Sequence, residues 1–135
     1  MMMWQYLAYF MGTPYVYGGN SVITGIDCSG LVLEGMRAKG YMTKADMGSQ
    51  QLAIFLKANG WAEATGVAPD DILFFGKNSN SIEHVAVAVN ETQMIEAGGG
   101  DSTTVTMKQA SERNAMVRIR PINWRKDFLF ALFKD

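Results

Sequence analysis

The chain changes character near residue 60, and that change constrains its fold more than any other feature. Before this point, apolar side chains recur at the spacing of a helix face. After it come short runs of strand-forming residues separated by turn residues. Helices followed by a run of strands predict an α+β domain whose N-terminal helices pack on a small antiparallel sheet. A chain of 135 residues can bury one core, so we predict a single domain over residues 1–135.

Capping residues and glycines bound three expected helices. These helices cover the first dozen residues, ended by Gly12; Cys28–Lys39, with Asp27 as N-cap and Gly40 as stop; and Gln50–Ala58, with Ser49 as N-cap and Gly60 as stop. The expected strands are Ile72–Phe75, His84–Val89, Met94–Ala97, Thr103–Met107 and Met116–Ile119. In the second strand, alternation gives a valine face, assigned to the core, and a face with His84 and two alanines. The small alanines are expected to leave room for a helix end or a substrate.

The chain contains one cysteine and one histidine, and both have contexts that suit a catalytic pair. Cys28 opens an expected helix, where unpaired backbone N–H groups and the helix dipole push a thiol towards thiolate. His84 opens an expected strand and, if it lies beside Cys28, could take or hold the proton. The alternatives are an inert buried thiol and a structural histidine. A zinc site would need several carboxylates to complete it, so we predict neither a metal nor another cofactor.

The length of one turn decides whether Glu96 joins this pair. A three-residue turn at Asn90-Glu91-Thr92 would place Glu96 opposite Ala86, as a diagonal neighbour of His84. Its carboxylate could then accept the N–H of His84 and hold the ring in one tautomer. A turn of two or four residues would place Glu96 on the valine face instead. The alternative interpretation of Glu96 is a solvent-exposed strand residue.

Charge and hydropathy limit the partners of the chain. A formal net charge of −1 gives no general attraction to nucleic acid. The apolar opening segment is too short to span a bilayer, and it has no Lys or Arg before Arg37. We therefore predict neither a membrane span nor a signal peptide. The sequence leaves the oligomeric state open.

Four blocks, in order along most of the chain, resemble the NlpC-type cell-wall peptidases. The blocks are GTPYVYGG, IDCSGLV, APDDILFF and HVAVAVNETQMIEA. Members of this family are papain-like cysteine peptidases that cut the peptide stems of bacterial peptidoglycan. The resemblance implies a papain-like α+β fold with Cys28 as nucleophile and His84 as base. It further implies that Tyr15 lines the active site, and that Asp27 and Ser29 help to hold the free amino end of a stem peptide.

The chain departs from the family pattern at two positions. The family's Pro-Gly-Asp motif is Pro69-Asp70-Asp71 here, a change expected to alter only a turn. The third catalytic position, commonly a histidine in the family, is Glu96, which we predict as the third catalytic residue. A bare domain of this size resembles a phage-encoded lysin or tail-associated enzyme. Such a protein is expected to be made in the cytoplasm and to act on the wall after release or as part of a phage particle.

The sequence thus predicts a cysteine endopeptidase that hydrolyses an amide bond in peptidoglycan stem peptides through a Cys28 acyl-enzyme. Two alternatives remain open. One is an amidase or acyl-transfer enzyme on the same scaffold, acting on a different amide or ester. The other is a catalytically silent wall-binding module, in which Glu96 marks lost activity.

Overall fold

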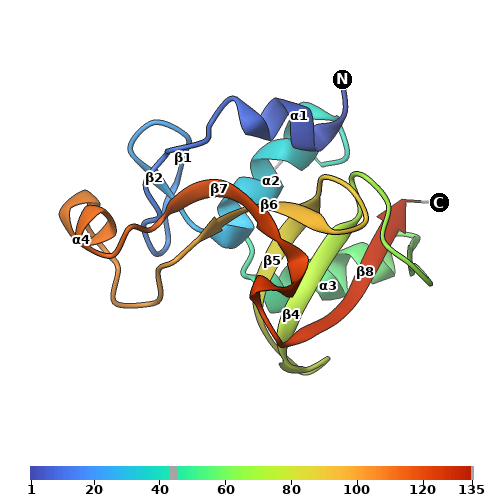
Figure 1. The fold of residues 1–135 in the computed structure, drawn as a ribbon. Helices are drawn as coiled ribbons and strands as arrows, with labels where there is room; N and C mark the ends of the chain where they lie inside the picture. Colours follow the sequence, from blue (N-terminus) through green and yellow to red (C-terminus); the bar gives the residue numbers. More distant parts are fainter. Residues whose placement is uncertain (43–45, 135) are drawn as a thin grey trace.

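A computed structural model describes residues 1–42 and 46–134 and confirms the predicted α+β fold. Its main sheet has six antiparallel strands in the order β3-β8-β4-β5-β6-β7 (Figure 1). These strands are β3 (Trp61–Glu63), β4 (Ile72–Asn78), β5 (Ser81–Ala88), β6 (Gln93–Gly98), β7 (Met116–Pro121) and β8 (Phe128–Lys134). A separate two-stranded sheet pairs β1 (Asn20–Ser21) with β2 (Gly25–Ile26).

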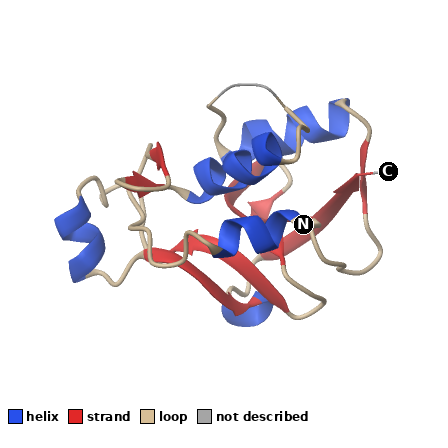
Figure 2. Cartoon of the chain, turned by 90° about the horizontal axis from the view of Figure 1, so that it is seen from above, coloured by secondary structure: helices blue, strands red, loops and turns tan. Residues whose placement is uncertain are grey.

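The helices gather mainly on one side of the main sheet (Figure 2). They are α1 (Met3–Ala8), α2 (Cys28–Ala38), α3 (Ser49–Ala58) and α4 (Met107–Glu112), with the 3₁₀ turn η1 (Ile122–Trp124). Helices α1, α2 and α3 all contact β5, whereas α4 lies at the far end of the molecule beside β1 and β2 (Figure 1). None of the helices in the described ranges combines the length and apolar character that a membrane crossing requires.

Two expected helices differ in detail from those observed. Helix α1 ends at Ala8, because the N–H groups of Tyr9 and Phe10 bond three residues back and tighten the chain into turns. Helix α3 begins at Ser49, so the prediction of Ser49 as N-cap is wrong. Its hydroxyl instead donates to the Ile82 carbonyl at 3.2 Å, which ties the start of α3 to β5. The N-cap is Gly48.

The departure at Asp70 does more than alter a turn, which corrects the sequence interpretation. Asp70 adopts a φ of 72°, in the left-handed region that glycine usually occupies. Its carboxylate accepts the N–H groups of Met3 and Trp4 at 2.8 and 2.9 Å. The first turn of a helix leaves such donors without a partner inside the helix. Asp70, which lies just before β4, therefore fixes the start of α1.

The strand predictions fail at the segments 61–63, 103–107 and 128–134. Thr103–Met107 is not a strand, because polar side chains take its backbone donors: Asp101 accepts the N–H of Thr103, and Gln109 accepts those of Val105 and Thr106. Strand β8 was not predicted, yet it lies between β3 and β4 in the sheet. Its continuous apolar run, FLFALF, is typical of a strand covered on both faces.

Strand β5 is covered on both faces. Val85 and Val87 are fully buried in the main core beneath the helices, as predicted. Ala86 and Ala88 are also fully buried, in a second cluster with Leu73, Phe75, Met94 and Ala131. The expectation of open space along the alanine face is therefore wrong. The small side chains there allow close packing instead.

Candidate active site

Cys28 occupies the first position of α2, where the loop before the helix is tightly held. The carboxylate of Asp27 accepts the Gly30 N–H at 2.8 Å and the Ser29 hydroxyl at 3.3 Å, which confirms Asp27 as N-cap. Its second oxygen accepts the Gly18 N–H at 3.0 Å. The Cys28 side chain is half-buried. No described residue accepts the backbone N–H of Cys28 or Ser29, so both donors remain available at the helix start.

The β5–β6 hairpin brings His84 and Glu96 together. Val87 pairs with Ile95 and Ala88 with Met94, which leaves a three-residue turn and sets Glu96 opposite Ala86, as predicted. His84 Nε2 lies 2.6 Å from Glu96 Oε1. The two residues are only 5% and 2% exposed, so water competes little for this contact. The contact expected from the turn length is present.

The surroundings favour the charged form of His84. Burial alone would lower its pKa, but interactions with the Cys28 side chain and with Glu96 outweigh burial and raise the pKa to about 9. Burial likewise acts to raise the pKa of Glu96, but its hydrogen bond to His84 and nearby arginines hold it below the usual value. At neutral pH the pair is therefore an imidazolium and a carboxylate, and the imidazolium interacts with the Cys28 side chain.

Tyr15 is buried beside Cys28. Its N–H donates to the Ala115 carbonyl at 3.1 Å, and it forms a β-bridge with Ile26. Gly100 crosses so close to the ring that a Cβ there would overlap Tyr15 Cδ1. Burial, followed by the charges of Cys28 and Asp27, raises the pKa of Tyr15, so the phenol keeps its proton and can donate.

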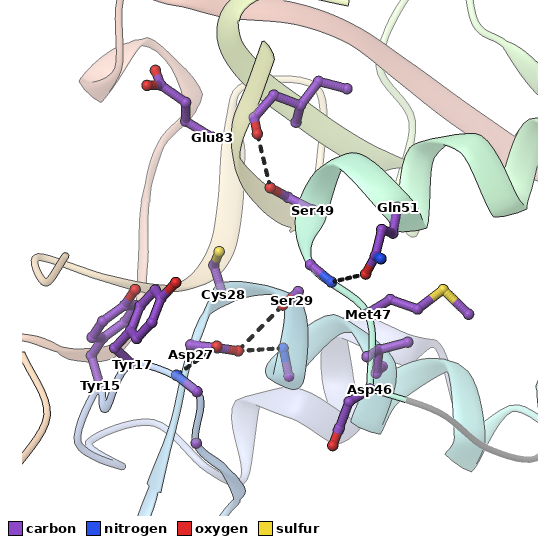
Figure 3. A pocket seen from close by; sticks show the side chains of 16 residues that line it. Tyr15, Tyr17, Asp27, Cys28, Ser29, Asp46, Met47, Ser49, Gln51 and Glu83 are labelled. Carbon is purple, nitrogen blue, oxygen red and sulfur yellow. Dashed lines mark hydrogen bonds between the residues drawn. The ribbon is translucent and has the colours of Figure 1, made fainter. Parts of the chain in front are cut away.

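A cleft of ≈ 500 Å³ opens at Cys28. Figure 3 shows the thiol between the rings of Tyr15 and Tyr17 on one side and the start of α3 on the other. The acidic residues Asp27, Asp46 and Glu83 line this Cys28 cleft, and none of its described lining residues is basic. Tyr15, Asp27 and Ser29, which were predicted as substrate-binding residues, all line the cleft.

A second cavity, of ≈ 220 Å³, lies at His84. It is lined by His84, Glu96, Gly98–Gly100, Arg120, Trp124 and Arg125. Arg120 Nε is 3.6 Å from Glu96 Oε2. Sequence reasoning missed both arginines. The alternation of Arg118 and Arg120 in β7 was a usable signal, but only the β6–β7 register places Arg120 diagonally across from Glu96.

The sequence profile of the NlpC/P60 family matches residues 12–120. This chain belongs to the NlpC/P60 family. It is 33% identical over 92 residues to the gamma-D-glutamyl-L-lysine dipeptidyl-peptidase of Bacillus subtilis, covering 67% of this chain and 29% of that protein. It is 28% identical over 106 residues to the gamma-DL-glutamyl hydrolase of the same organism, covering 72% and 23%. The chain thus spans less than a third of either relative.

Solved NlpC/P60 structures share the fold. The NlpC/p60 domain of the peptidoglycan hydrolase SagA superposes with a TM-score of 0.70 at 22% identity, covering 97% of this chain and 95% of that one. RipD of Mycobacterium tuberculosis, described as a non-catalytic NlpC/p60 domain protein, gives 0.69 at 17% identity, covering 98% and 94%. Because the family includes a non-catalytic member, family membership alone does not establish activity for this chain.

Proposed function

We propose that this protein is a cysteine peptidase that hydrolyses an amide bond in peptidoglycan stem peptides. The observation that carries the proposal is the buried 2.6 Å contact between His84 and Glu96, which favours an imidazolium beside Cys28. A thiolate paired with an imidazolium is an activated nucleophile with a proton donor in place. Family membership supports the same chemistry. Both curated relatives are named for γ-glutamyl bonds, so we take a γ-glutamyl amide as the first candidate bond.

The proposed reaction has two steps, the formation of an acyl-enzyme and its hydrolysis. In the first, Cys28 Sγ attacks the amide carbon, and the free N–H groups of Cys28 and Ser29 stabilise the oxyanion together with the Tyr15 hydroxyl. The C–N bond then breaks, the leaving amine takes the proton of His84, and a thioester remains on Cys28. In the second step, neutral His84 takes a proton from water, which attacks the thioester and releases the acid. Glu96 holds the ring of His84 throughout.

The Cys28 cleft suits a substrate with a positive charge on its acyl side. Asp27, Asp46 and Glu83 supply carboxylates around it. Asp27 retains acceptor capacity beyond its cap, because an ionised carboxylate offers about four lone-pair sites. We propose that the free amino end of a stem peptide binds here, with Asp27 and Ser29 as contacts.

Selective alkylation tests the proposal, because Cys28 is the only cysteine in the chain. Purified peptidoglycan is incubated with untreated protein and with protein alkylated by iodoacetamide, and the released fragments are weighed by mass spectrometry. We expect peptide fragments cut within the stem from the untreated protein and none from the alkylated protein. Equal products from both would remove Cys28 from the mechanism. Fragments that separate whole stems from sugar would favour an amidase, and no fragments at all would favour a silent binding module.

A further inference from the structure

The two cavities are lined by different members of the reacting pair. Cys28 lines the larger cleft and His84 lines the smaller cavity. In the proposed reaction the acyl carbon bonds to Cys28, whereas the leaving nitrogen takes its proton from His84. The acyl part of the substrate therefore lies in the Cys28 cleft, and the leaving residue points towards the smaller cavity. We call the smaller cavity, with the lining residues given above, the Arg120–Arg125 cavity.

The charges that line the two cavities differ. Three acidic residues and no basic one are among the described residues that line the Cys28 cleft. The Arg120–Arg125 cavity, by contrast, is lined by two arginines. Glu96 is the one acidic residue among its described lining residues. One oxygen of Glu96 is taken by His84 at 2.6 Å. Asp127, which is outside the cavity lining, pairs with Arg125 at 2.7 Å. Arg120, Arg125 and the imidazolium of His84 thus face two carboxylates, and one positive charge remains.

Both guanidinium groups are held in place and keep free donors. Arg120 lies over the Trp124 ring, 4.4 Å from its centroid, and its side chain is only 16% exposed. Among the described residues, no protein group accepts a hydrogen bond from Arg120. Arg125 gives Nε and Nη2 to Asp127 at 2.9 and 2.7 Å, which leaves Nη1 free. Fixed guanidinium groups with unused donors suit a carboxylate.

The glycine wall of the cavity leaves room for such a group. A Cβ on Gly98 would lie 2.5 Å from Glu96 Oε2, and Gly99 has a φ of 86°. Any larger residue at these positions would push into Glu96 or strain the backbone. The volume of ≈ 220 Å³ is below the roughly 300–1,000 Å³ of pockets that hold whole ligands. The cavity is thus sized for part of one residue.

We infer that the Arg120–Arg125 cavity is a subsite for a carboxylate on the leaving residue. The inference rests on the proposed function, because that reaction puts the leaving residue on the His84 side. The carboxylate can be a side-chain group or the free α-carboxylate of a C-terminal residue, and both present the same chemistry to the two arginines. The protein is then a peptidase that prefers an anionic leaving residue to a neutral one.

Three matched peptides test this preference. They share an L-alanyl-γ-D-glutamyl acyl part with a free amino end, and their leaving residues are L-glutamine amide, L-glutamate amide and L-glutamine with a free α-carboxylate. We expect kcat/KM to be about tenfold higher for at least one carboxylate-bearing peptide, mainly through KM, because a charge-assisted hydrogen bond is gained. The glutamate amide reports a side-chain carboxylate, and the free glutamine reports an α-carboxylate.

Variants assign the preference to the arginines. Arg120→Gln and Arg125→Gln are each expected to bring the ratio of kcat/KM values towards one, whereas Arg125→Lys keeps part of it. The ratio is insensitive to a general loss of activity, which matters because Arg120 also contacts Glu96. Lys126→Gln is the matched control, since it removes the same charge next to Arg125 from a residue outside the cavity lining, and it should keep the full preference.

Binding separates this inference from the proposed function. The same peptides are titrated into Cys28→Ala protein by calorimetry, where no hydrolysis is needed. Tighter binding of a carboxylate-bearing peptide than of the neutral peptide supports the cavity assignment. This holds even if the wild-type protein hydrolyses none of the three peptides, because absence of hydrolysis would reject only the proposed function. Equal kcat/KM values in the wild type, equal affinities in Cys28→Ala or no binding at all would overturn the carboxylate subsite.

Discussion

Replacing Cys28 with alanine is expected to reduce hydrolysis of a defined stem peptide to the rate measured without protein. The loss should be at least about 10⁴-fold, because the variant has no nucleophile and the remaining groups of the site cannot form the acyl-enzyme. Alanine is well tolerated within a helix, and the Asp27 cap does not use the thiol. The measurement is the initial rate by chromatography of the products, alongside thermal unfolding of both proteins.

Ser102→Ala provides the control for Cys28→Ala. Ser102 is exposed and lines neither the Cys28 cleft nor the Arg120–Arg125 cavity, so its replacement should change neither rate nor unfolding temperature. A Cys28→Ala protein that folds normally and still hydrolyses the peptide at the wild-type rate would exclude covalent catalysis by this thiol.

Replacing Glu96 with glutamine is expected to lower kcat by about a hundredfold or more and to change the pH profile. A glutamine has no charge to stabilise the imidazolium, and its amide can hold His84 in the wrong tautomer. His84 loses its proton as pH rises through about 9, so wild-type activity should fall across that pH. Because Glu96 raises the pKa of His84, the variant should lose activity at lower pH than the wild type.

The control for Glu96→Gln makes the same chemical change in the same hairpin. Glu91 lies exposed in the β5–β6 turn, so Glu91→Gln should leave both kcat and the basic limb of the profile unchanged. An unshifted basic limb in Glu96→Gln, with undiminished turnover, would reduce Glu96 to a packing residue.

A carboxylate at the third position makes different demands from the histidine common in the family. Glu96 is 2% exposed, and a buried carboxylate without partners is strongly destabilising. Here His84 takes one oxygen, and Arg120 lies 3.6 Å from the other. The arginines thus offset the burial of Glu96 and, in our inference, also face the leaving residue. This arrangement explains how a departure from the family pattern is compatible with an active site.

Local signals predicted the parts of the site that depend on neighbouring residues. The cap at Asp27 follows from its place before an apolar helix, and the His84–Glu96 contact follows from a turn of fixed length. In a short hairpin the length of the turn determines the register of the two strands. One residue more or less in the turn would move every side chain of the second strand to the other face of the sheet. Local pattern together with the family resemblance therefore singled out Cys28, His84 and Glu96.

Features that depend on distant segments could not be predicted in this way. The contact of Arg120 with Glu96 requires the pairing of β6 with β7, across the loop that contains α4. The burial of Ala86 and Ala88 depends on residues of β4 and β8. Thr103–Met107 has strand-forming composition, but the side chains of Asp101 and Gln109 bind its backbone donors. In each case tertiary contacts or side-chain hydrogen bonds outweigh the structure that the local sequence favours.

The central claim is that Cys28 and Glu96 both interact with His84 and stabilise its charged form. A measurement of the His84 pKa tests this claim most directly. The chain has a single histidine, so one imidazole signal can be followed by NMR as pH is varied. We predict a midpoint near 9 in the wild type and a lower midpoint in both Cys28→Ala and Glu96→Gln. A wild-type midpoint at or below the ordinary 6.5, unchanged by either substitution, would contradict the account.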